Sequence, residues 1–449
     1  MPGIVSGINR RSLVNVERLL YRAPYCDIIM MARFKGDITE KSLKKSLAMA
    51  KLKYPMMSAR IEQDEKGDAS FVFDGVPDFQ VKVLTKKTES DWFNQAWQEQ
   101  KEPFDLKNGP LIKFLLLRST DSSDLVVICH HTICDGLSLV YLVKDIAIFL
   151  NKPEKDVQPF PLPPSISEEN FIINVKPGLL LGIIIGYLNH SWKKAKAAFS
   201  ENDYKELYIK YWKSRDIGMT VISLSKETTA SLISRCHEEH VTVNSALTTA
   251  FSLAQYDLEG RNQAYLKRAL IAINIRKFFK NPPGDNFGFL AAGIQVALPS
   301  GKGSFWDAAR EFNVKVKGYL APKKVLGAMA TLNNLDPTLI DAIYFTAYSS
   351  FKNKTARRLK NLILTPTDKP RRSMDITNLG DIKIGENTNL ETIFFVPILS
   401  PNYEKAIGIV TAGGELNIVM LYDRSQISTD TIERFKQRII NYIEEAIGK

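Results

Sequence analysis

The sequence predicts an α/β (α+β) protein made of two halves that a long connector joins. A chain of 449 residues is longer than a single hydrophobic core usually grows. Helix-like and strand-like apolar patterns alternate on both sides of residues 153–213, and that stretch itself has a different composition. We therefore expect a first half over residues 1–165, a connector over 166–214 and a second half over 215–449.

Helix and strand signals alternate through the first half. Thr39 is a residue type that caps helices, and the apolar spacing after it continues until Pro55, so a helix is expected over 39–54. The apolar runs 111–117 and 125–131 flank the polar turn STDSSD and predict a β-hairpin. The other elements expected in this half are a helix over 11–21, a strand pair around 69–83, a helix that Ser90 opens, and a helix over 136–150.

The proline-rich stretch PFPLPPS leads into the connector, and the connector contains an uninterrupted apolar run over 178–188. Beyond the connector, the alternation of helices and strands resumes. A last helix is expected from Ser428, because Asp430 and Glu433 are spaced as a capping pair. The other elements expected in this half are a helix over 243–257, strands over 269–276 and 288–298, a helix over 305–320, a strand over 391–399, and a hairpin over 406–422.

Composition narrows the class of protein. Apolar residues make up 45% of the chain and charged residues 24%, which is typical of a globular protein and excludes a disordered or fibrous one. The net charge of +11 favours anionic partners such as phosphates, acidic proteins or lipid headgroups. Four cysteines without a CxxC pair argue against a disulfide framework and a zinc ribbon. The N-terminal residues lack the apolar run of a signal peptide, so we expect a cytoplasmic protein.

The stretch VVICHHTICDGLSLV places two of the five histidines side by side at the end of a predicted buried strand. Because strand side chains alternate between faces, His131 shares a face with Cys129 while His130 points the other way. One imidazole can therefore line a cleft while the other packs into the structure. Asp135 lies too far along the chain to be assumed a partner of His131, and we expect it to pair with a cation from elsewhere. Gly136 supplies the conformational freedom or the close approach that a strand-to-helix turn often needs.

Two alternatives involve no general base. The motif is also explained by a pair of core histidines that precede a helix cap. Metal binding is the second alternative, since Cys129 and Cys134 lie beside the histidines, but tetrahedral sites usually draw ligand pairs from separated segments and no second pair is present. The cluster Cys236, His237 and His240 lacks the HExxH order and is interpreted as a solvated helix face. We therefore expect no metal.

The motif HHxxxDG, filled by residues 130–136, resembles the active-site motif of the acyltransferase superfamily that includes chloramphenicol acetyltransferase, nonribosomal peptide condensation domains, plant BAHD acyltransferases and mycobacterial polyketide-associated acyltransferases. Other segments are similar to the family's in the same order. The stretch KGDITEKSLKKSLAMAKLKYPMMSARIEQ is similar to the start of the family's sequences, with Tyr54 where histidine is common. Residues 272–276 and 285–289 resemble the family's N-x-R…G-x-F segment. Residues 374–380 resemble the family's S-N-L-G segment. The plant signature DFGWG is absent, which disfavours a BAHD enzyme.

The resemblance implies a stand-alone acyltransferase, similar to polyketide-associated or alcohol acyltransferases, with two sandwich halves and an active-site tunnel at their interface. In such enzymes a hydroxyl or amine acceptor attacks a thioester carried by coenzyme A or by the phosphopantetheine of a carrier protein. The thioester is a substrate, so no bound cofactor is expected. The nearest approach to G-x-S-x-G, residues 136–140, lacks the final glycine, and direct transfer without a covalent nucleophile is preferred.

The same resemblance assigns roles to individual residues. His131 is the general base, and the ordinary imidazole pKa of about 6.5 suits that task near neutral pH. Asp135 is its structural support and pairs with an arginine, for which Arg276 is the candidate. The supporting positions are His130, Gly136 and Arg276 as structural residues, with Thr377 and Asn378 as contacts to the oxyanion or the substrate.

Rival functions stay open. Among enzymes with the same expected fold, the rival is a condensation or esterification enzyme that receives its thioester substrate from a separate carrier protein. Outside catalysis, it can be a carrier-protein-binding or lipid-binding module, although the intact HHxxxDG motif argues against this. Basic runs such as residues 357–360 lack a nucleic-acid-binding motif, so we expect no nucleic-acid partner. We expect a monomer.

The apolar run over 178–188 raises the question of membrane contact. Its 11 residues are too few to span a bilayer, which takes about 20. A buried inter-domain helix is one interpretation. In the other interpretation, Tyr187 and Trp192 lie at a membrane interface, and the lysines that follow contact anionic headgroups, namely Lys193, Lys194 and Lys196. This second interpretation predicts peripheral membrane contact and a hydrophobic acceptor or acyl group.

Overall fold

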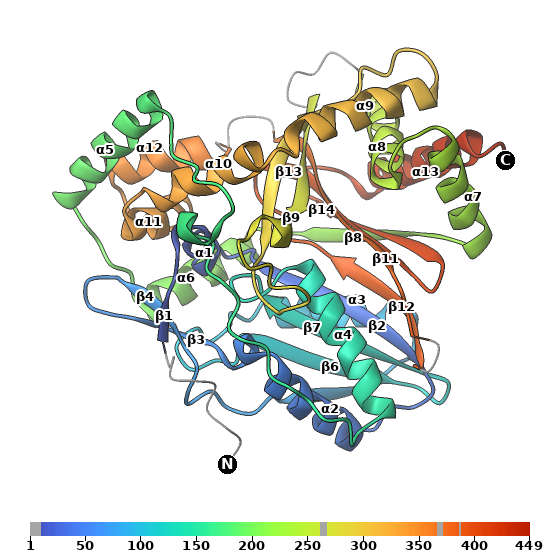
Figure 1. The fold of residues 1–449 in the computed structure, drawn as a ribbon, viewed down its shortest axis with the longest axis horizontal. Coiled ribbons are helices and arrows are strands. Elements are labelled where there is room, and N and C mark those ends of the chain that lie inside the picture. Colours follow the sequence, from blue (N-terminus) through green and yellow to red (C-terminus); the bar gives the residue numbers. More distant parts are fainter. Residues whose placement is uncertain (1–9, 261–266, 366–370, 386–387) are drawn as a thin grey trace.

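The longest apolar strands of the chain form two β-sheets, and each sheet is the centre of one lobe (Figure 1). The structure is a computed structural model that describes residues 10–260, 267–365, 371–385 and 388–449. Its mixture of helices and sheets and its two lobes confirm the predicted fold class.

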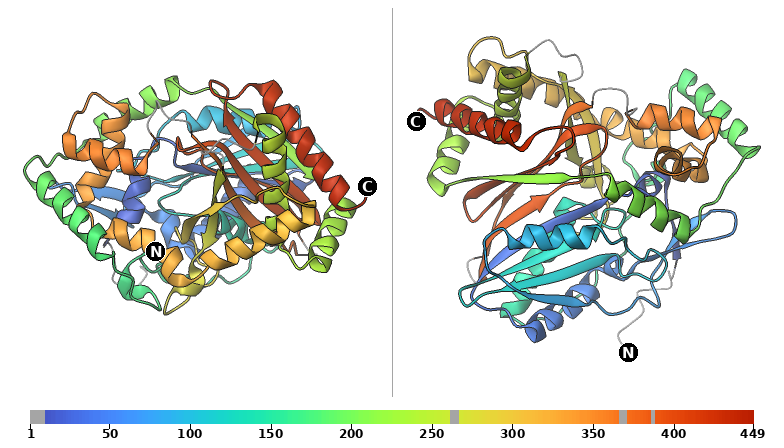
Figure 2. Two further views of the ribbon diagram at one scale, coloured as in Figure 1. Left: turned by 90° about the horizontal axis from the view of Figure 1, so that it is seen from above. Right: turned by 180° about the vertical axis from the view of Figure 1, so that it is seen from behind.

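The first sheet has the strand order β12-β2-β7-β6-β5. Helices cover both of its faces, with α2 and α4 in front in Figure 1 and α3 behind, as the right view of Figure 2 shows. Burial on both faces explains why the central strands are apolar without alternation. The elements are β2 (Asp27–Lys35), α2 (Glu40–Lys53), β5 (Val81–Thr85), α3 (Asp91–Gln100), β6 (Ile112–Arg118), β7 (Ser122–His130), α4 (Gly136–Asn151) and β12 (Leu390–Val396).

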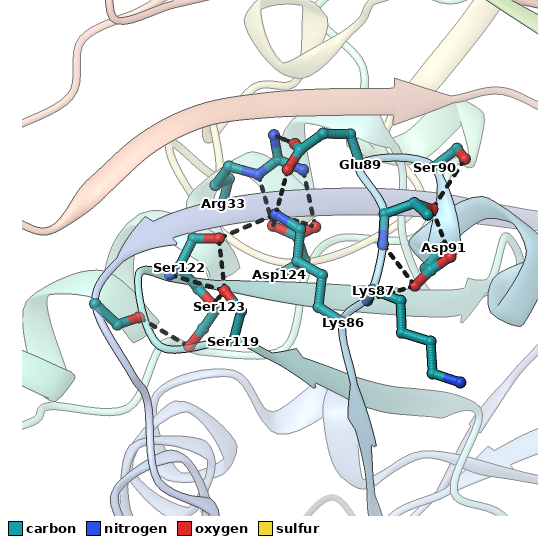
Figure 3. A network of polar contacts seen from close by, with 12 residues as sticks. Arg33, Lys86, Lys87, Glu89, Ser90, Asp91, Ser119, Ser122, Ser123 and Asp124 are labelled. Atoms are coloured by element: carbon teal, nitrogen blue, oxygen red, sulfur yellow. Dashed lines mark hydrogen bonds and ion pairs between the residues drawn. The ribbon is translucent and has the colours of Figure 1, made fainter.

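A buried charge network fixes the end of β7 that lies away from the two histidines (Figure 3). The Asp124 carboxylate accepts hydrogen bonds from Arg33 Nε at 2.7 Å and Nη2 at 2.9 Å, and Lys86 Nζ lies 3.3 Å away. The side chain of Asp124 is fully buried, so these two cations offset the cost of removing its charge from water. The network joins β2 and β7 to the segment between β5 and α3.

The second sheet has the strand order β10-β9-β11-β13-β14-β8, and α7, α8, α9 and α13 pack on its outer face in Figure 1. Alternate residues of β13 divide between two cores. Ile407 and Ile409 pack beneath the helices, whereas Ala406 and Val410 join the core of the first lobe. The elements are β8 (Ile217–Leu224), α7 (Lys226–Glu238), α8 (Val243–Glu259), β9 (Arg268–Asn274), β10 (Ala291–Ala297), α9 (Phe305–Tyr319), β11 (Arg372–Ile382), β13 (Tyr403–Ala412), β14 (Glu415–Asp423) and α13 (Thr429–Ala446).

The predicted strand over 391–399 leaves the second half and completes the first sheet. It is β12, and it pairs antiparallel with β2, where Phe394 lies opposite Met31. Gly408 of β13 packs so closely on this strand that a Cβ atom there would lie 2.3 Å from the carbonyl oxygen of Phe395. The division at residues 165 and 214 stays a prediction, and β12 is a strand that crosses it.

Six helices and a small sheet form a third group, at the left of Figure 1. The helices are α1 (Asn15–Tyr21), α5 (Leu179–Lys193), α6 (Glu201–Lys213), α10 (Pro322–Asn333), α11 (Pro337–Tyr348) and α12 (Lys354–Ile363). The small sheet has the order β1-β4-β3 and consists of β1 (Arg10–Ser12), β3 (Arg60–Gln63) and β4 (Ala69–Val72). Short 3₁₀ helices are η1 (Pro55–Ser58), η2 (Glu168–Asn170) and η4 (Arg276–Phe278). Within the described ranges, each helix is too short or too polar to cross a bilayer.

Several local predictions are confirmed and others are wrong. Thr39 caps α2 by accepting a hydrogen bond from Ser42 N, and β6 and β7 form the predicted hairpin. The strand pair around 69–83 does not form, because β4 pairs with β3 and β1 while β5 pairs with the apolar strand β6. The first helix begins at Asn15, since residues 10–12 are strand β1. The last helix is capped by Ser428, and Glu433 instead accepts a hydrogen bond from the Thr220 hydroxyl of β8.

Candidate active site

The two histidines lie where β7 gives way to helix α4. Strand β7 ends at His130, and backbone hydrogen bonds hold both histidines in place. His130 N donates to Leu111 O at 3.0 Å, and His131 N donates to Cys26 O at 2.8 Å. The ladder to the neighbouring strands thus continues past the last strand residue and fixes the position from which His131 projects.

The His130 side chain is buried inside the first lobe. Its Nδ1 accepts a hydrogen bond from Thr132 N at 3.4 Å, its Nε2 lies 3.7 Å from Cys26 Sγ, and its ring meets the Phe104 ring edge-on at 5.9 Å. Burial and the nearby charges of His131 and Arg22 lower the pKa of His130 to about 3. A neutral, enclosed imidazole agrees with the structural position predicted for His130.

The His131 side chain stays partly exposed, and its tautomer is set by one contact. Nδ1 lies 2.7 Å from the carbonyl oxygen of Cys134. Since a carbonyl only accepts, Nδ1 carries the proton and Nε2 of the neutral ring has a free lone pair. The ring of Phe289, from the second half, lies edge-on to the imidazole at 5.1 Å. Burial lowers the pKa of His131, although the Cys134 carbonyl and the charge of Asp135 oppose the shift. His131 therefore presents a neutral imidazole where the two halves meet.

Asp135 caps helix α4 and also binds the second half of the chain. Its Oδ1 accepts hydrogen bonds from Ser138 N and Ser138 Oγ, both at 2.8 Å. Arg276 reaches both oxygens, Oδ2 from Nη1 at 2.8 Å and Oδ1 from Nη2 at 3.1 Å. Leu290 N adds a bond to Oδ2 at 3.1 Å. Burial alone would raise the pKa of Asp135, but the Arg276 charge and these hydrogen bonds lower it. The expected pair between Asp135 and Arg276 is present.

Arg276 reaches Asp135 because the backbone turns just before it. The predicted strand over 269–276 ends early, at Asn274, whose Oδ1 accepts a hydrogen bond from Arg276 N at 3.0 Å. This side-chain contact replaces the strand ladder with a turn that directs the guanidinium to the first half. Arg276 also donates to the carbonyl oxygen of Asn286 at 3.2 Å.

Ser138 is a supporting residue that sequence reasoning missed. Its hydroxyl lies 2.8 Å from both Asp135 Oδ1 and Gly288 O, and it accepts a hydrogen bond from Gly288 N at 3.1 Å. Arg276 Nη2 approaches the same oxygen at 3.1 Å. These contacts hold Gly288 out of a strand, so the strand predicted from residue 288 begins only at Ala291. The signal that could have found Ser138 is its place three residues after an N-cap aspartate.

Gly136 permits a close approach between the lobes. A Cβ atom at this position would lie 2.7 Å from Leu379 Cδ2 and 3.1 Å from Phe395 Cζ. Its φ is not positive, so the glycine is needed for space and not for a left-handed conformation. Of the two reasons predicted for Gly136, the structure supports the close approach.

The structure distinguishes the two residues predicted as oxyanion or substrate contacts. Thr377 of β11 pairs with Gly408 of β13, on the face that turns to the first lobe. Asn378 points the other way, and its Nδ2 lies 3.5 Å from Asn244 Oδ1 on α8. Neighbouring residues of a strand face opposite sides, so only Thr377 lies on the face shared with the first lobe. Asn378 is therefore poorly placed for that contact.

Comparisons with known proteins show which proteins the chain resembles. The family model of the condensation domain matches residues 17–166. Cyclosporin synthetase from Tolypocladium inflatum is 26% identical over 263 residues, which cover 56% of this chain and 2% of the synthetase. The chain thus spans a small part of that relative's length.

Solved structures resemble the chain over almost its full length. A trichothecene 15-O-acetyltransferase from Fusarium sporotrichioides superposes with a TM-score of 0.67 at 12% identity, and covers 99% of this chain and 97% of its own. Polyketide synthase associated protein 5 from Mycobacterium tuberculosis gives a TM-score of 0.60 at 14% identity, with coverage of 97% and 100%. The chain shares the two-lobe fold of these solved structures, and its residues 17–166 match the condensation-domain model.

Proposed function

We propose that this protein is an acyltransferase that moves an acyl group from a thioester to a hydroxyl or amine acceptor, with His131 as the general base. The observation that carries the proposal is the contact between His131 Nδ1 and the Cys134 carbonyl oxygen at 2.7 Å. This contact keeps Nε2 unprotonated, and the lowered pKa keeps the whole ring neutral near neutral pH. His131 is thereby prepared to accept a proton.

In the proposed reaction, the acceptor oxygen or nitrogen attacks the carbonyl carbon of the thioester as His131 Nε2 removes its proton. A new C–O or C–N bond forms, and the carbonyl electrons move to the oxygen. The oxyanion then collapses, the C–S bond breaks, and the thiolate leaves and takes the proton from the imidazolium. No covalent enzyme intermediate and no bound cofactor take part. Thr377, on the inter-lobe face of β11, is the residue we assign to the oxyanion or the substrate.

A positioned base of this kind contributes roughly 10²–10⁴-fold to the rate. Asp135 acts through structure in this account, because its carboxylate binds Ser138, Arg276 and Leu290 and is not paired with the imidazole. It fixes the start of α4 and the position of the second half. Further rate would come from alignment of the two substrates and from an oxyanion donor, which can contribute about 3–4 kcal/mol.

The partly exposed ring of Phe289 against His131 supports a hydrophobic acceptor or acyl chain at the proposed site. The donor is the thioester of coenzyme A or of a carrier-protein phosphopantetheine. The net charge of +11 favours both, since one carries phosphates and the other is expected to be acidic.

Thiol release tests the function and selects the donor. The purified chain is incubated with acetyl-coenzyme A, octanoyl-coenzyme A or an acyl-loaded carrier protein, each with and without long-chain alcohols and amines. We expect acceptor-dependent thiol release and an ester or amide product. Release with carrier-bound donors alone would identify a condensation enzyme with a separate carrier. No product with any donor would favour a non-catalytic binding module.

A further inference from the structure

Helix α5 carries a broad apolar surface that the rest of the described chain leaves uncovered. The large exposed side chains on it, with their exposed fractions, are Leu179 (83%), Leu180 (78%), Leu181 (39%), Ile183 (61%), Ile184 (48%) and Tyr187 (54%). Soluble proteins rarely leave so many neighbouring large apolar side chains in water, and such patches usually mark an interaction site.

The opposite face of α5 already anchors the helix to the protein. Ile185, Leu188 and Trp192 follow helical spacing and are buried. Trp192 Nε1 donates to the Thr338 hydroxyl on α11 at 2.8 Å, and Asn189 Nδ2 donates to the Asn334 carbonyl oxygen at 2.9 Å. The helix thus needs one face to fold, and the second apolar face has no structural use within the described residues.

Helix α12 extends this surface and adds positive charge. Arg358 Nη1 donates to Tyr187 OH at 2.5 Å, and the guanidinium lies 5.5 Å from the centre of the Tyr187 ring. Leu362 of α12 is 69% exposed. The two helices lie side by side at the outer edge of the molecule in Figures 1 and 2. We call these two exposed helix faces together the α5–α12 surface.

Acidic residues are absent from the segments that form this surface. Residues 171–199 and 351–365 contain no aspartate or glutamate. Their basic side chains are Lys176, Lys193, Lys194, Lys196, Lys352, Lys354, Arg357, Arg358 and Lys360. The surface therefore combines exposed aliphatic side chains, a tyrosine and cations of one sign, which is the composition of helices that lie in the plane of a membrane.

We propose that the α5–α12 surface binds the interface of an anionic phospholipid bilayer. The aliphatic side chains at the start of α5 enter the acyl boundary, while the lysines and arginines contact the headgroups. Binding is peripheral and reversible, because α5 is too short to span the bilayer. The proposal does not depend on acyl transfer, because it rests on the exposed apolar side chains and the positive charge of the α5–α12 surface. Its test measures the binding of vesicles and not catalysis.

Vesicle co-sedimentation tests the proposal with matched variants. Wild type should bind vesicles of phosphatidylcholine mixed with phosphatidylserine, more weakly at high salt, and should bind pure phosphatidylcholine less. The variant L180S/I183S/I184S should lose at least about tenfold in partitioning, because three aliphatic side chains no longer leave water. R357Q/R358Q/K360Q should lose the preference for the anionic vesicles. The control I209S/V314S removes exposed aliphatic side chains on α6 and α9 and should bind as wild type does.

A second readout avoids variants that fail to fold. All four natural cysteines are buried, so a cysteine placed at position 180 can be labelled alone with an environment-sensitive dye. The dye on L180C should shift to the blue with anionic vesicles, and the same dye on V314C should not. The proposal is overturned if wild type ignores anionic vesicles at low salt, or if patch and control variants bind equally. It is also overturned if light scattering shows a stable dimer that L180S/I183S/I184S dissociates, because the surface would then belong to a second copy.

Discussion

Arg276 binds both carboxylate oxygens of Asp135, at 2.8 and 3.1 Å, and so joins the second half of the chain to the N-terminus of helix α4. Both side chains are almost fully buried. The loop that carries His131 precedes this helix directly, so the ion pair that holds the halves together also sets the position of the proposed base.

The first prediction follows from that pair. Asp135→Asn keeps the size of the side chain but removes its charge, which leaves the Arg276 guanidinium buried without a counter-ion. Breaking one side of a buried pair commonly costs about 3–5 kcal/mol, so urea denaturation should show a loss of that order together with lower acyl transfer. An unchanged midpoint with unchanged activity would contradict the structural role.

A double-mutant cycle separates the pair from its surroundings. Arg276→Gln alone should also destabilise, and the double variant should lose much less than the sum of the two single losses. Arg215→Gln is a matched control, because that arginine pairs with Asp423 in the same half. Its loss of stability should add to that of Asp135→Asn without coupling. Additive effects for Asp135 and Arg276 would count against direct coupling.

The pH profile of the reaction follows from the environment of His131. Burial lowers the pKa of His131 below 6.5, despite the Cys134 carbonyl and the Asp135 charge. The free base is therefore retained below the usual imidazole range, and the acid limb of kcat/KM should have its midpoint below pH 6.5 when a non-ionising alcohol is the acceptor. A midpoint above that value would mean that the imidazolium is favoured and that another group sets the rate.

Gly136→Ala tests the close approach of the lobes. The added methyl group would meet Leu379 and Phe395, so we expect a loss of about 1–3 kcal/mol and reduced activity. Gly182→Ala is the control, since a Cβ atom at that helical position meets no atom within 4 Å. It should stabilise by up to about 1 kcal/mol. Equal effects of the two substitutions on the melting temperature would remove the packing argument.

Asp375 predicts a pH dependence of stability. This carboxyl on β11 is 7% exposed, and burial raises its pKa to about 7. The folded state therefore holds the proton more tightly than the unfolded chain, whose carboxyl titrates near 3.9. Stability should fall as pH rises from about 4 to about 7, by up to about 4 kcal/mol. Asp375→Asn should remove this part of the slope and stabilise the protein above pH 7.

Asp27 contributes a similar pH dependence, because burial raises its pKa to about 7 as well. It is present in both wild type and Asp375→Asn, so its contribution cancels when the two stability curves are subtracted. The difference between wild type and Asp375→Asn therefore isolates Asp375. Parallel stability curves over this pH range would show that Asp375 ionises freely.

Patterns local in sequence predicted much of this structure. The Thr39 cap, the β6–β7 hairpin and the helix after Asp135 depend on neighbouring residues, and all three are present. Some local predictions were wrong as well, such as the start of the first helix and the capping pair of the last one, but the larger differences concern long-range pairing. Strand β12 pairs with β2 of the first lobe, and β5 pairs with β6 and not with β4. These pairings depend on the packing of whole sheets, which a local pattern does not contain.

The candidate site divides in the same way. The HHxxxDG motif and its resemblance to known acyltransferases pointed to His131, Asp135 and Arg276, and the last two meet as expected. Ser138 carried only a local signal, its place three residues after the capping aspartate, whereas its contact with Gly288 and the contact of Phe289 with His131 reach across about 150 residues of chain or more. The exposure of α5 was equally hidden, because an apolar run predicts a helix but does not say which faces are covered.

The most direct test of the account is acyl transfer by His131→Ala, measured as thiol release with the best donor and acceptor pair. We expect the rate of acyl transfer to fall about 10²–10⁴-fold. The melting temperature should be unchanged, because the substitution leaves the backbone contacts of the loop intact. His237→Ala, which removes an exposed histidine on α7, should retain full activity. Turnover by folded His131→Ala at the rate of wild type would contradict the central claim that His131 is the general base.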